Sequence, residues 1–454
     1  MRSLPLISVI ILLTTFWACE PVVNKVEIKE IQNTSSTPRA VYTYTNIGHA
    51  LNERKNVKIL ELDQDTKIDS LIALPQLQEL RISLMPDDHI PSKLPKLSLL
   101  KKLAVNIYTN TPKSKSILAS IDQLSQLEEL QLIFYPLVLP TEPFRKFKQL
   151  RTLSLSFITS PIPNAIYSIS SLKELHLNGD FSELSEELGQ LIHLERLHID
   201  AKGPLQYLPT TIGKLQQLHS FHASQQNLHE LPVSFQQLQH LEYLNLKDNP
   251  FDHFPLAITA LVHLQDLDLQ NCPLTSIPAS IGQLQQLKHL YLTNTNLTRL
   301  PNGFEQLKAL KKLRLNENKF LEFPTALIAL THLKQLYIGK NQLQELPASI
   351  ASLTALNTLV INDNHLQKLP QEIAQLTQLE NLNLSGNPIA NFPIEILPLS
   401  QLKLLDLSNC QLKKIPQEID QLYNLNYLNI TGNHLHQAQI DHIKTLLPHC
   451  FIKN

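Results

Sequence analysis

Residues 333–355 read LKQLYIGKNQLQELPASIASLTA, and residues 356–378 continue without a gap as LNTLVINDNHLQKLPQEIAQLTQ. Both fit the pattern LxxLxLxxNxLxxLPxxIxxLxx, with another apolar residue at some of the Leu positions. This 23-residue unit recurs without insertion or deletion from Leu218 to His434, starting at Leu218, Leu241, Leu264, Leu287, Leu310, Leu333, Leu356, Leu379, Leu402 and Leu425. A chain of 454 residues would ordinarily suggest about three domains, but a fixed period predicts one stack of repeats.

The start of each unit has the periodicity of a strand. At positions 4 and 6, apolar residues such as Leu244 and Leu246 alternate with polar ones, as expected for a strand buried on one face. A single unit cannot bury its own leucines, so neighbouring units must stack. We therefore expect a parallel sheet whose strands lie about 4.8 Å apart.

The second half of each unit predicts a turn back across the core. Apolar residues follow at three-residue steps, as in Ile350 and Leu353, which indicates a short α or 3-10 segment. A proline precedes each of these segments at position 15, and its fixed φ suits the first residue of a helical turn. The nine prolines are Pro232, Pro255, Pro278, Pro301, Pro324, Pro347, Pro370, Pro393 and Pro416.

Position 9 predicts a structural ladder. Because Asn can both donate and accept, an Asn side chain inside a turn can satisfy backbone groups of its own unit and of a neighbouring one. The position holds Asn249, Asn318, Asn341, Asn364, Asn387 and Asn433, with Gln226, Cys272, Thr295 and Cys410 as substitutes.

These features together resemble the leucine-rich repeat superfamily, in particular its LxxLPxxI subclass, over roughly residues 57–447. The resemblance implies an α/β leucine-rich repeat solenoid, a curved horseshoe with a parallel inner β-sheet and short α or 3-10 segments on the convex side. It also implies binding of a protein, peptide or glycan on the concave face, which is what most members of the superfamily do.

Residues 1–19 predict a signal peptide. Arg2 precedes an uncharged run from Ser3 to Ala18, which is too short to span a bilayer comfortably and fits the apolar core of a secretory signal. The segment ending at Cys19 resembles a bacterial lipobox, which implies lipidation of Cys19 and a membrane-anchored lipoprotein of the cell envelope. Bulky Trp17 departs from that pattern and leaves two alternatives open, a cleaved but soluble protein and an uncleaved start.

The boundaries of the remaining segments follow from where the repeat pattern begins and ends. Residues 20–44 are predicted to be a tether, 45–56 an N-terminal cap helix, 57–434 about seventeen repeats, and 435–454 a C-terminal cap. The less regular repeats begin at Val57, Leu77, Leu100, Leu127, Leu150, Leu172 and Leu194. A 27-residue interval adds a loop near Tyr108 to Lys115, and this irregularity indicates either drift or a second shaped site.

Composition argues against several functions. Lys and Arg total 39 against 40 for Asp and Glu, so nothing attracts a polyanion and no nucleic-acid partner is expected. Cys272 and Cys410 lie six repeats apart, about 29 Å and beyond disulfide reach. The chain contains no GxxxxGK[ST], GxGxxG, HExxH or GxSxG motif, so we expect no enzyme activity and no cofactor. His240 and His263 share one repeat position, but solvated turn residues are the simpler interpretation, and no metal is expected.

Three functions remain. The favoured one is a monomeric, membrane-tethered binding module. The alternative is a cytoplasmic signalling scaffold, because the LxxLPxxI unit is similar to that of leucine-rich repeat proteins that engage small GTPases. A purely structural spacer would instead need a featureless inner face.

Strand alternation predicts the binding face. Since positions 4 and 6 point into the core, positions 3 and 5 must face solvent on the concave sheet. Exposed Tyr and Arg are enriched in energetic interface centres, and they occur in successive units together with acidic and basic residues. The predicted ligand residues are Tyr243, Asp266, Asp268, His289, Tyr291, Lys312, Arg314, Gln335 and Tyr337, alongside Asn245. The next units are blander, with Thr358, Val360, Asn381 and Asn383.

Overall fold

The computed structural model describes residues 43–44, 50, 57–63, 71, 73–84, 94–107, 121, 123–137, 144, 146–159, 162–203 and 205–454. Contacts divide the chain into the units Met1–Ala40 and Val41–Asn454, and all described residues belong to the second. The predicted signal peptide with Cys19, the tether up to residue 42, and the loop near Tyr108 lie outside the described residues. Of the predicted cap helix only Ala50 is described, and it is helical and fully buried.

Nineteen strands among the described residues form one parallel sheet in which each strand pairs with the next along the chain. A strand begins two residues after each of the seventeen predicted repeat starts. The strands are β1 (Thr43–Tyr44), β2 (Ile59–Asp63), β3 (Glu79–Leu84), β4 (Lys102–Ile107), β5 (Glu129–Leu137), β6 (Thr152–Thr159), β7 (Glu174–Asp180), β8 (Arg196–Ala201), β9 (Ser220–His222), β10 (Tyr243–Asn245), β11 (Asp266–Asp268), β12 (His289–Tyr291), β13 (Lys312–Arg314), β14 (Gln335–Tyr337), β15 (Thr358–Val360), β16 (Asn381–Asn383), β17 (Leu404–Asp406), β18 (Tyr427–Asn429) and β19 (Phe451–Lys453).

Two strands lie outside the predicted repeats. β1 falls in the segment predicted as tether and extends the sheet beyond β2. β19 follows the cap helix α3 (Gln437–Leu446) and pairs with β18. The chain therefore adds a strand beyond each end of the repeats.

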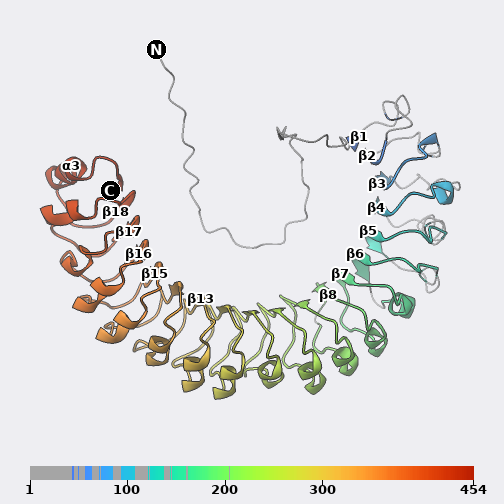
Figure 1. Cartoon of the computed structure of the whole chain (residues 1–454), viewed down its shortest axis with the longest axis horizontal. Coiled ribbons are helices and arrows are strands. Elements are labelled where there is room, and N and C mark those ends of the chain that lie inside the picture. Colours follow the sequence, from blue (N-terminus) through green and yellow to red (C-terminus); the bar gives the residue numbers. More distant parts are fainter. Residues whose placement is uncertain are drawn as a thin grey trace, which may run out of the picture. The chain divides into compact units, whose positions relative to one another are not determined.

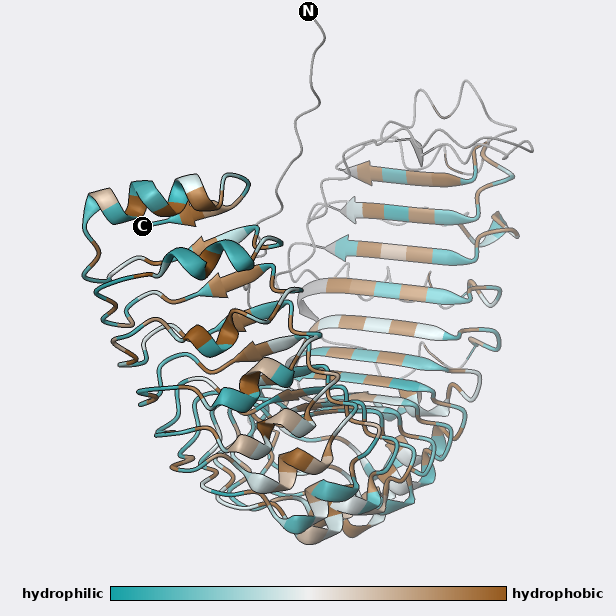
Figure 2. Cartoon of the chain, turned by 60° about the vertical axis from the view of Figure 1, so that its left-hand side comes forward, coloured by the Kyte–Doolittle hydropathy of each residue, from teal (hydrophilic) through white to brown (hydrophobic). Residues whose placement is uncertain are grey.

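Within the Val41–Asn454 unit, the sheet lines the inner side of a curve and the 3-10 segments lie on its outer side (Figure 1). The expected α/β leucine-rich repeat solenoid is thereby confirmed. Equal repeat lengths keep the register in phase, so that Asp266, His289, Lys312 and Gln335 are direct partners on successive strands. Figure 2 shows the strands alternating between hydrophilic and hydrophobic residues, which separates the solvent face from the core face.

The outer segments of the repeats are 3-10 helices. They are η2 (Leu94–Lys96), η3 (Asn164–Ser168), η4 (Glu186–Gln190), η5 (Thr210–Lys214), η6 (Val233–Gln237), η7 (Leu256–Ala260), η8 (Ala279–Gln283), η9 (Asn302–Gln306), η10 (Thr325–Ala329), η11 (Ala348–Ser352), η12 (Gln371–Gln375), η13 (Ile394–Ile396) and η14 (Gln417–Gln421).

The repeated proline lies one residue earlier than predicted. It is the residue before the 3-10 turn, in an extended conformation, as at Pro232 with φ −63° and ψ 148°. Its carbonyl accepts the first hydrogen bond of the turn, from the Phe235 N–H at 2.9 Å. The missing N–H of proline costs nothing here, because a residue at this position has no carbonyl within the turn to bond.

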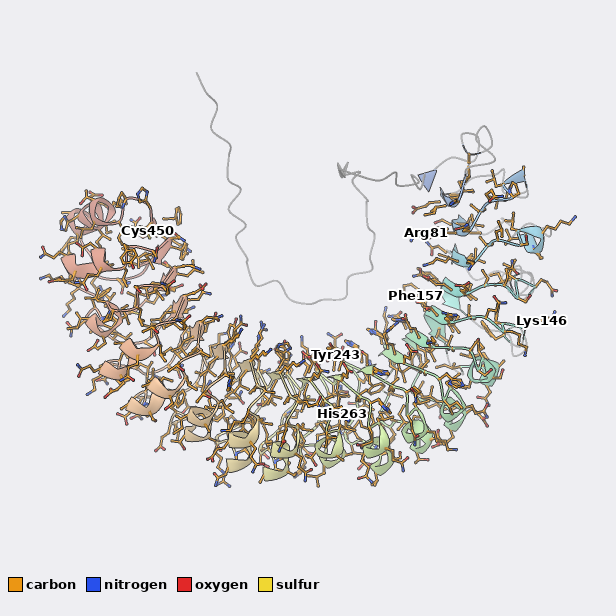
Figure 3. All side chains as sticks on the ribbon, in the orientation of Figure 1. Arg81, Lys146, Phe157, Tyr243, His263 and Cys450 are labelled. Atoms are coloured by element: carbon orange, nitrogen blue, oxygen red, sulfur yellow. The ribbon has the colours of Figure 1, made fainter. Side chains whose placement is uncertain are left out.

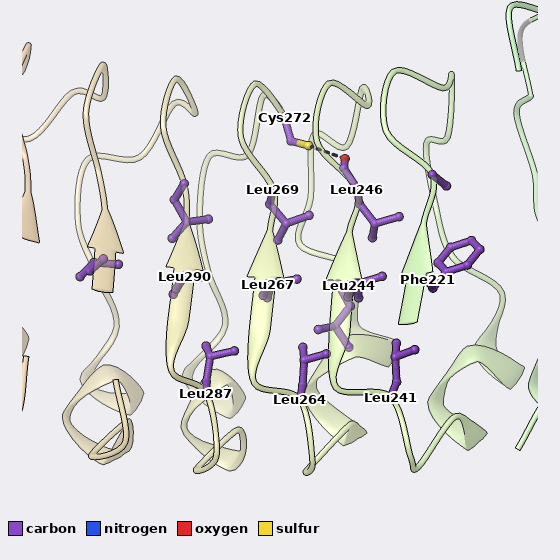
Figure 4. Close-up of a cluster of buried hydrophobic side chains, with 14 of the residues drawn as sticks. Phe221, Leu241, Leu244, Leu246, Leu264, Leu267, Leu269, Cys272, Leu287 and Leu290 are labelled. Carbon is purple, nitrogen blue, oxygen red and sulfur yellow. Dashed lines mark hydrogen bonds between the residues drawn. The ribbon is translucent and has the colours of Figure 1, made fainter. Parts of the chain in front are cut away.

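Among the described residues one hydrophobic core extends from Ala50 to Leu447, and Figure 4 shows equivalent leucines of successive repeats next to one another. Leu241, Leu264 and Leu287 are all fully buried. The Asn ladder is formed as predicted. Nδ2 of Asn249 donates to Ala223 O and Leu246 O at 2.8 Å each, and its Oδ1 accepts from Leu228 N at 3.1 Å. In Figure 4, Sγ of Cys272 donates to the same kind of carbonyl, Leu246 O, at 3.4 Å.

Position 8 of the regular repeats has a left-handed backbone that the sequence interpretation did not include. All ten residues there have φ between 51° and 71°, and five are Asn or Asp and two are Gly, the types that tolerate this conformation best. They are Gln225, Asp248, Asn271, Asn294, Glu317, Lys340, Asp363, Gly386, Asn409 and Gly432.

No helix in the described part of the chain has both the length and the apolar character needed to cross a bilayer. α3 begins at a capping box between His436 and Gln439 and buries Ile440 and Ile443 against the last repeat.

Candidate functional site

Positions 3 and 5 of the central strands face away from the core. Leu267, Leu290, Leu313 and Leu336 between them are fully buried, whereas the flanking residues are partly exposed. Tyr243 is 48% exposed, and Figure 3 places it on the inner side of the curve. The predicted ligand residues therefore share one surface, which we call the central concave surface. It consists of repeat positions 3 and 5, the first and last residues of each strand from β10 to β14.

The centre of this surface is a stack of cations and aromatic rings. The Arg314 guanidinium carbon lies 5.5 Å from the ring centre of Tyr291 and 5.1 Å from that of Tyr337. The Lys312 Nζ lies 5.7 and 5.8 Å from the same two rings. These distances fall within the range of cation–π attraction. Consecutive strands therefore assemble an aromatic–basic–aromatic cluster.

Two positive charges occur in this cluster without an acidic partner. Neither Lys312 nor Arg314 forms an ion pair with the described residues, and the buried Arg314 Nε has no hydrogen-bond partner among them. Burial and the neighbouring Arg314 charge lower the pKa of Lys312. Burial raises the pKa of both tyrosines. Because an unpaired, partly desolvated cation pair is costly, the cluster favours a bound anion.

The acidic side of the surface is already engaged. Asp266 Oδ1 lies 2.6 Å from Nδ1 of His289 on the next strand. Asp268 accepts hydrogen bonds from the Gln270 N–H at 3.0 Å and from Gln270 Nε2 at 2.9 Å. Burial raises the pKa of Asp268. Asp268 thus stabilises its own turn, as Asn245 does when its Oδ1 accepts from Lys247 N at 3.0 Å.

At the two ends of the central concave surface, side chains form fewer hydrogen bonds. Tyr243 and Gln335 form no side-chain hydrogen bond with the described residues. Beyond them, Asn381 Nδ2 donates to Thr358 Oγ1 at 3.3 Å, and Asn383 accepts from Ser385 N at 2.9 Å. The structure places all nine predicted residues together, and their binding of a ligand stays a prediction.

The sequence interpretation missed a column of histidines on the same face. His176, His198 and His222 are register partners on β7, β8 and β9, with ring centres 5.5 and 4.1 Å apart. Burial lowers the pKa of all three, and that of His222 falls to about 4, with the neighbouring histidines contributing. The sequence feature that could have revealed this column is a His at position 5 of three consecutive repeats.

A second missed feature lies at the C-terminal end. Leu404, Tyr427 and Phe451 are register partners, and the rings of Tyr427 and Phe451 stack with centres 5.9 Å apart. Leu404 is 44% and Phe451 65% exposed. The sequence pattern does not reveal Phe451, because its strand follows a helix and not a repeat.

His240 and His263 have separate hydrogen-bond partners. Nδ1 of His240 lies 2.7 Å from Gln216 O, and Nδ1 of His263 lies 3.1 Å from Gln286 Nε2. Over the described part of the chain no three His, Cys, Asp or Glu residues come together as a metal site. Cys272, Cys410 and Cys450 are free thiols.

Comparison with known proteins gives a consistent result. Family profiles described as "Leucine-rich repeat region", "Leucine rich repeat" and "Leucine Rich Repeat" match residues 233–338, 331–389 and 401–422. A leucine-rich repeat protein of Leptospira interrogans is 31% identical, covers 91% of this chain and 100% of its own, and superposes with a TM-score of 0.67. No curated protein matches the sequence.

More distant structures share the fold. The Arabidopsis receptor kinase HAESA ectodomain, in complex with an IDA peptide hormone, is 24% identical over 87% of this chain and 73% of its own, with a TM-score of 0.57. The Arabidopsis GASSHO1/SCHENGEN3 ectodomain, in complex with CASPARIAN STRIP INTEGRITY FACTOR 2, is 23% identical over 84% and 53%, with a TM-score of 0.56.

Proposed function

Because this chain belongs to the leucine-rich repeat superfamily, we propose that it is a non-enzymatic binding module whose central concave surface holds a protein or peptide segment. The segment lies across β10–β14 and brings an acidic side chain to Lys312 and Arg314.

The observation that carries this proposal is the Tyr291–Arg314–Tyr337 stack. It joins aromatic area to a guanidinium whose Nε has no partner among the described residues. Tyr and Arg in partly desolvated settings are the residues that most often dominate binding energy at interfaces. The HAESA ectodomain, which has the same fold, is in complex with a peptide hormone, so a solenoid of this kind can bind a peptide.

The test is comparative capture from the source organism. The Val41–Asn454 unit, immobilised, is compared with its Tyr291→Ala, Arg314→Ala and Asn381→Ala variants. Loss of the Tyr291 ring or the Arg314 guanidinium should weaken binding of a partner by roughly 1 kcal/mol or more, which is about a fivefold increase in Kd. Asn381→Ala is the matched control on the same face. A partner bound equally by all three variants would place the binding site elsewhere.

We further propose that the module is tethered to a bacterial envelope membrane through Cys19. The uncharged run ending at Ala18 and Cys19 supports this, and a diacylated cysteine would give the two acyl chains that stable anchoring needs. The wild type should then partition with membranes, and Cys19→Ala should remain unprocessed. Wild-type protein in the cytosol with Met1 intact would instead favour the intracellular scaffold with a small-GTPase-type partner.

A further inference from the structure

A groove of about 1000 Å³ lies on the edge of the solenoid where the chain enters β6, β7, β8 and β9. It is formed by corresponding stretches of four successive repeats, around residues 148–151, 170–173, 192–195 and 214–217. Two of these repeats, starting at Leu150 and Leu172, have 22 residues instead of 23. The groove therefore coincides with a departure from the regular period, away from the central concave surface.

The lining of the groove includes an exposed aliphatic residue. Ile192 is 52% exposed. The equivalent position, two residues before each repeat start, is polar in most of the later repeats, as at Gln216, Gln285, Thr354 and Ser400. A single exposed apolar residue is ordinary on a protein surface, and Ile192 matters here because it lines the groove together with the cations and can contact one apolar side chain of a ligand.

The lining of the groove has an excess of positive charge, although the whole chain has a net charge of −1. Four cations line it, at Lys148, Arg151, Lys173 and Lys214, against two carboxylates, at Glu128 and Glu195.

Both carboxylates are already paired. Glu195 pairs with Lys173, and Glu128 lies 2.6 Å from Lys101 Nζ outside the groove. Lys148, Arg151 and Lys214 form no ion pair with the described residues. These three cations therefore lie outside ion pairs and can attract a ligand, although Arg151 also interacts electrostatically with Glu128 at longer range.

From this arrangement we propose that the groove is a second binding site, which takes an acidic, extended protein segment with an apolar residue between two carboxylates. The spacing follows from the repeats. Measured across the stack, Ile192 lies two strands, about 10 Å, from its equivalent Lys148. It lies one strand, about 5 Å, from the repeat of Lys214, which comes two residues before Gln216, the equivalent of Ile192. At about 3.3 Å per residue, an extended chain places its first carboxylate three residues before the apolar residue and its second carboxylate two residues after it.

The probe is a fluorophore-labelled hexapeptide with glutamate at its first and sixth positions, leucine at its fourth and serine elsewhere. Binding to the Val41–Asn454 unit is measured by fluorescence polarisation at low salt, because exposed charges are screened as ionic strength rises. The combined Lys148→Glu, Arg151→Glu and Lys214→Glu variant should lose at least tenfold in affinity. Ile192→Ser should lose about threefold or more.

Matched controls separate this site from general charge effects. Lys311→Glu with Lys334→Glu changes two exposed cations that lead into β13 and β14, and should leave probe affinity unchanged. A probe with glutamine for glutamate, or serine for leucine, should bind more weakly to the wild type.

Two results would overturn the proposal. One is equal binding of the probe by the groove and control variants. The other is displacement of the probe by heparin together with unaltered affinity of the leucine-free probe, which would make the groove a polyanion surface. Neither result bears on the central concave surface, because no residue of that surface is changed.

Discussion

Replacing Asn341 by alanine tests how the ladder stabilises the solenoid. Nδ2 of Asn341 donates to the carbonyls of Leu315, Ile338 and Gly339 at 3.0, 3.1 and 3.1 Å. Its Oδ1 accepts from Phe320 N at 3.2 Å. Four contacts are lost in the variant, but their costs are unequal.

Each of the three carbonyls keeps another donor. Leu315 O still accepts from Asn318 Nδ2 at 3.1 Å, Ile338 O from Asn364 Nδ2 at 3.1 Å, and Gly339 O from Glu317 N at 3.0 Å. Only the buried N–H of Phe320 is left without an acceptor. One unsatisfied buried donor costs about 1–3 kcal/mol, so we expect Asn341→Ala to destabilise by about 2 kcal/mol.

Cys272→Ala is the matched comparison at the same ladder position. The Cys272 thiol donates to Leu246 O, which retains Asn249 Nδ2 at 2.8 Å, and the sulfur is a weak acceptor for the backbone N–H of Asn249. We therefore expect a loss below about 1 kcal/mol, from packing and weak contacts to sulfur.

The assay is urea denaturation of the Val41–Asn454 unit followed by circular dichroism. The comparison holds only if both variants keep the wild-type slope, since long repeat arrays can unfold in parts. A cost for Cys272→Ala equal to or above that for Asn341→Ala would refute this account of the ladder.

Three further predictions use the same unit and the same measurement. Cys272→Asn should raise the free energy of unfolding by about 1 kcal/mol, because an amide oxygen would accept from Phe251 N as Asn249 accepts from Leu228 N; a lower midpoint would contradict it. Burial raises the pKa of Cys272 and Cys410 to about 12, so the stability that the neutral thiols contribute is complete below the unfolded pKa near 9 and is lost as pH rises toward 12. The Cys272→Ala, Cys410→Ala double variant should therefore lose less free energy of unfolding than the wild type between pH 8 and 10, and an equal loss would contradict this prediction. The pKa of His222 is lowered to about 4, so on acidification the unfolded chain binds protons before the folded one, and the free energy of unfolding should fall between pH 6.5 and 4. Replacing His176, His198 and His222 by Asn should reduce that fall. An unchanged pH profile would show that the three histidines do not cause it.

The sequence by itself determined the repeat and its architecture. A strict 23-residue period, a two-residue alternation at each repeat start and a buried Asn at position 9 admit only stacked units, because no unit can bury its own leucines or satisfy its own turn. The strand positions, the ladder and the shared face of Tyr243 to Tyr337 all follow from those local rules. The Asn, Asp and Gly residues at position 8 also indicate its left-handed backbone, although we did not predict that conformation from the sequence.

Only the tertiary structure decided which side chains remain free. Asp266 and Asp268 look alike in sequence, yet one lies against His289 on the next strand and the other accepts from its own turn. Arg314 and Lys312 are left without an acidic partner because Arg314 has tyrosines on both neighbouring strands and Lys312 has His289 and Gln335. The groove around Ile192 and the stacking of Phe451 on Tyr427 likewise depend on contacts between units. Such contacts are set by distances across repeats, which the pattern within one repeat does not contain.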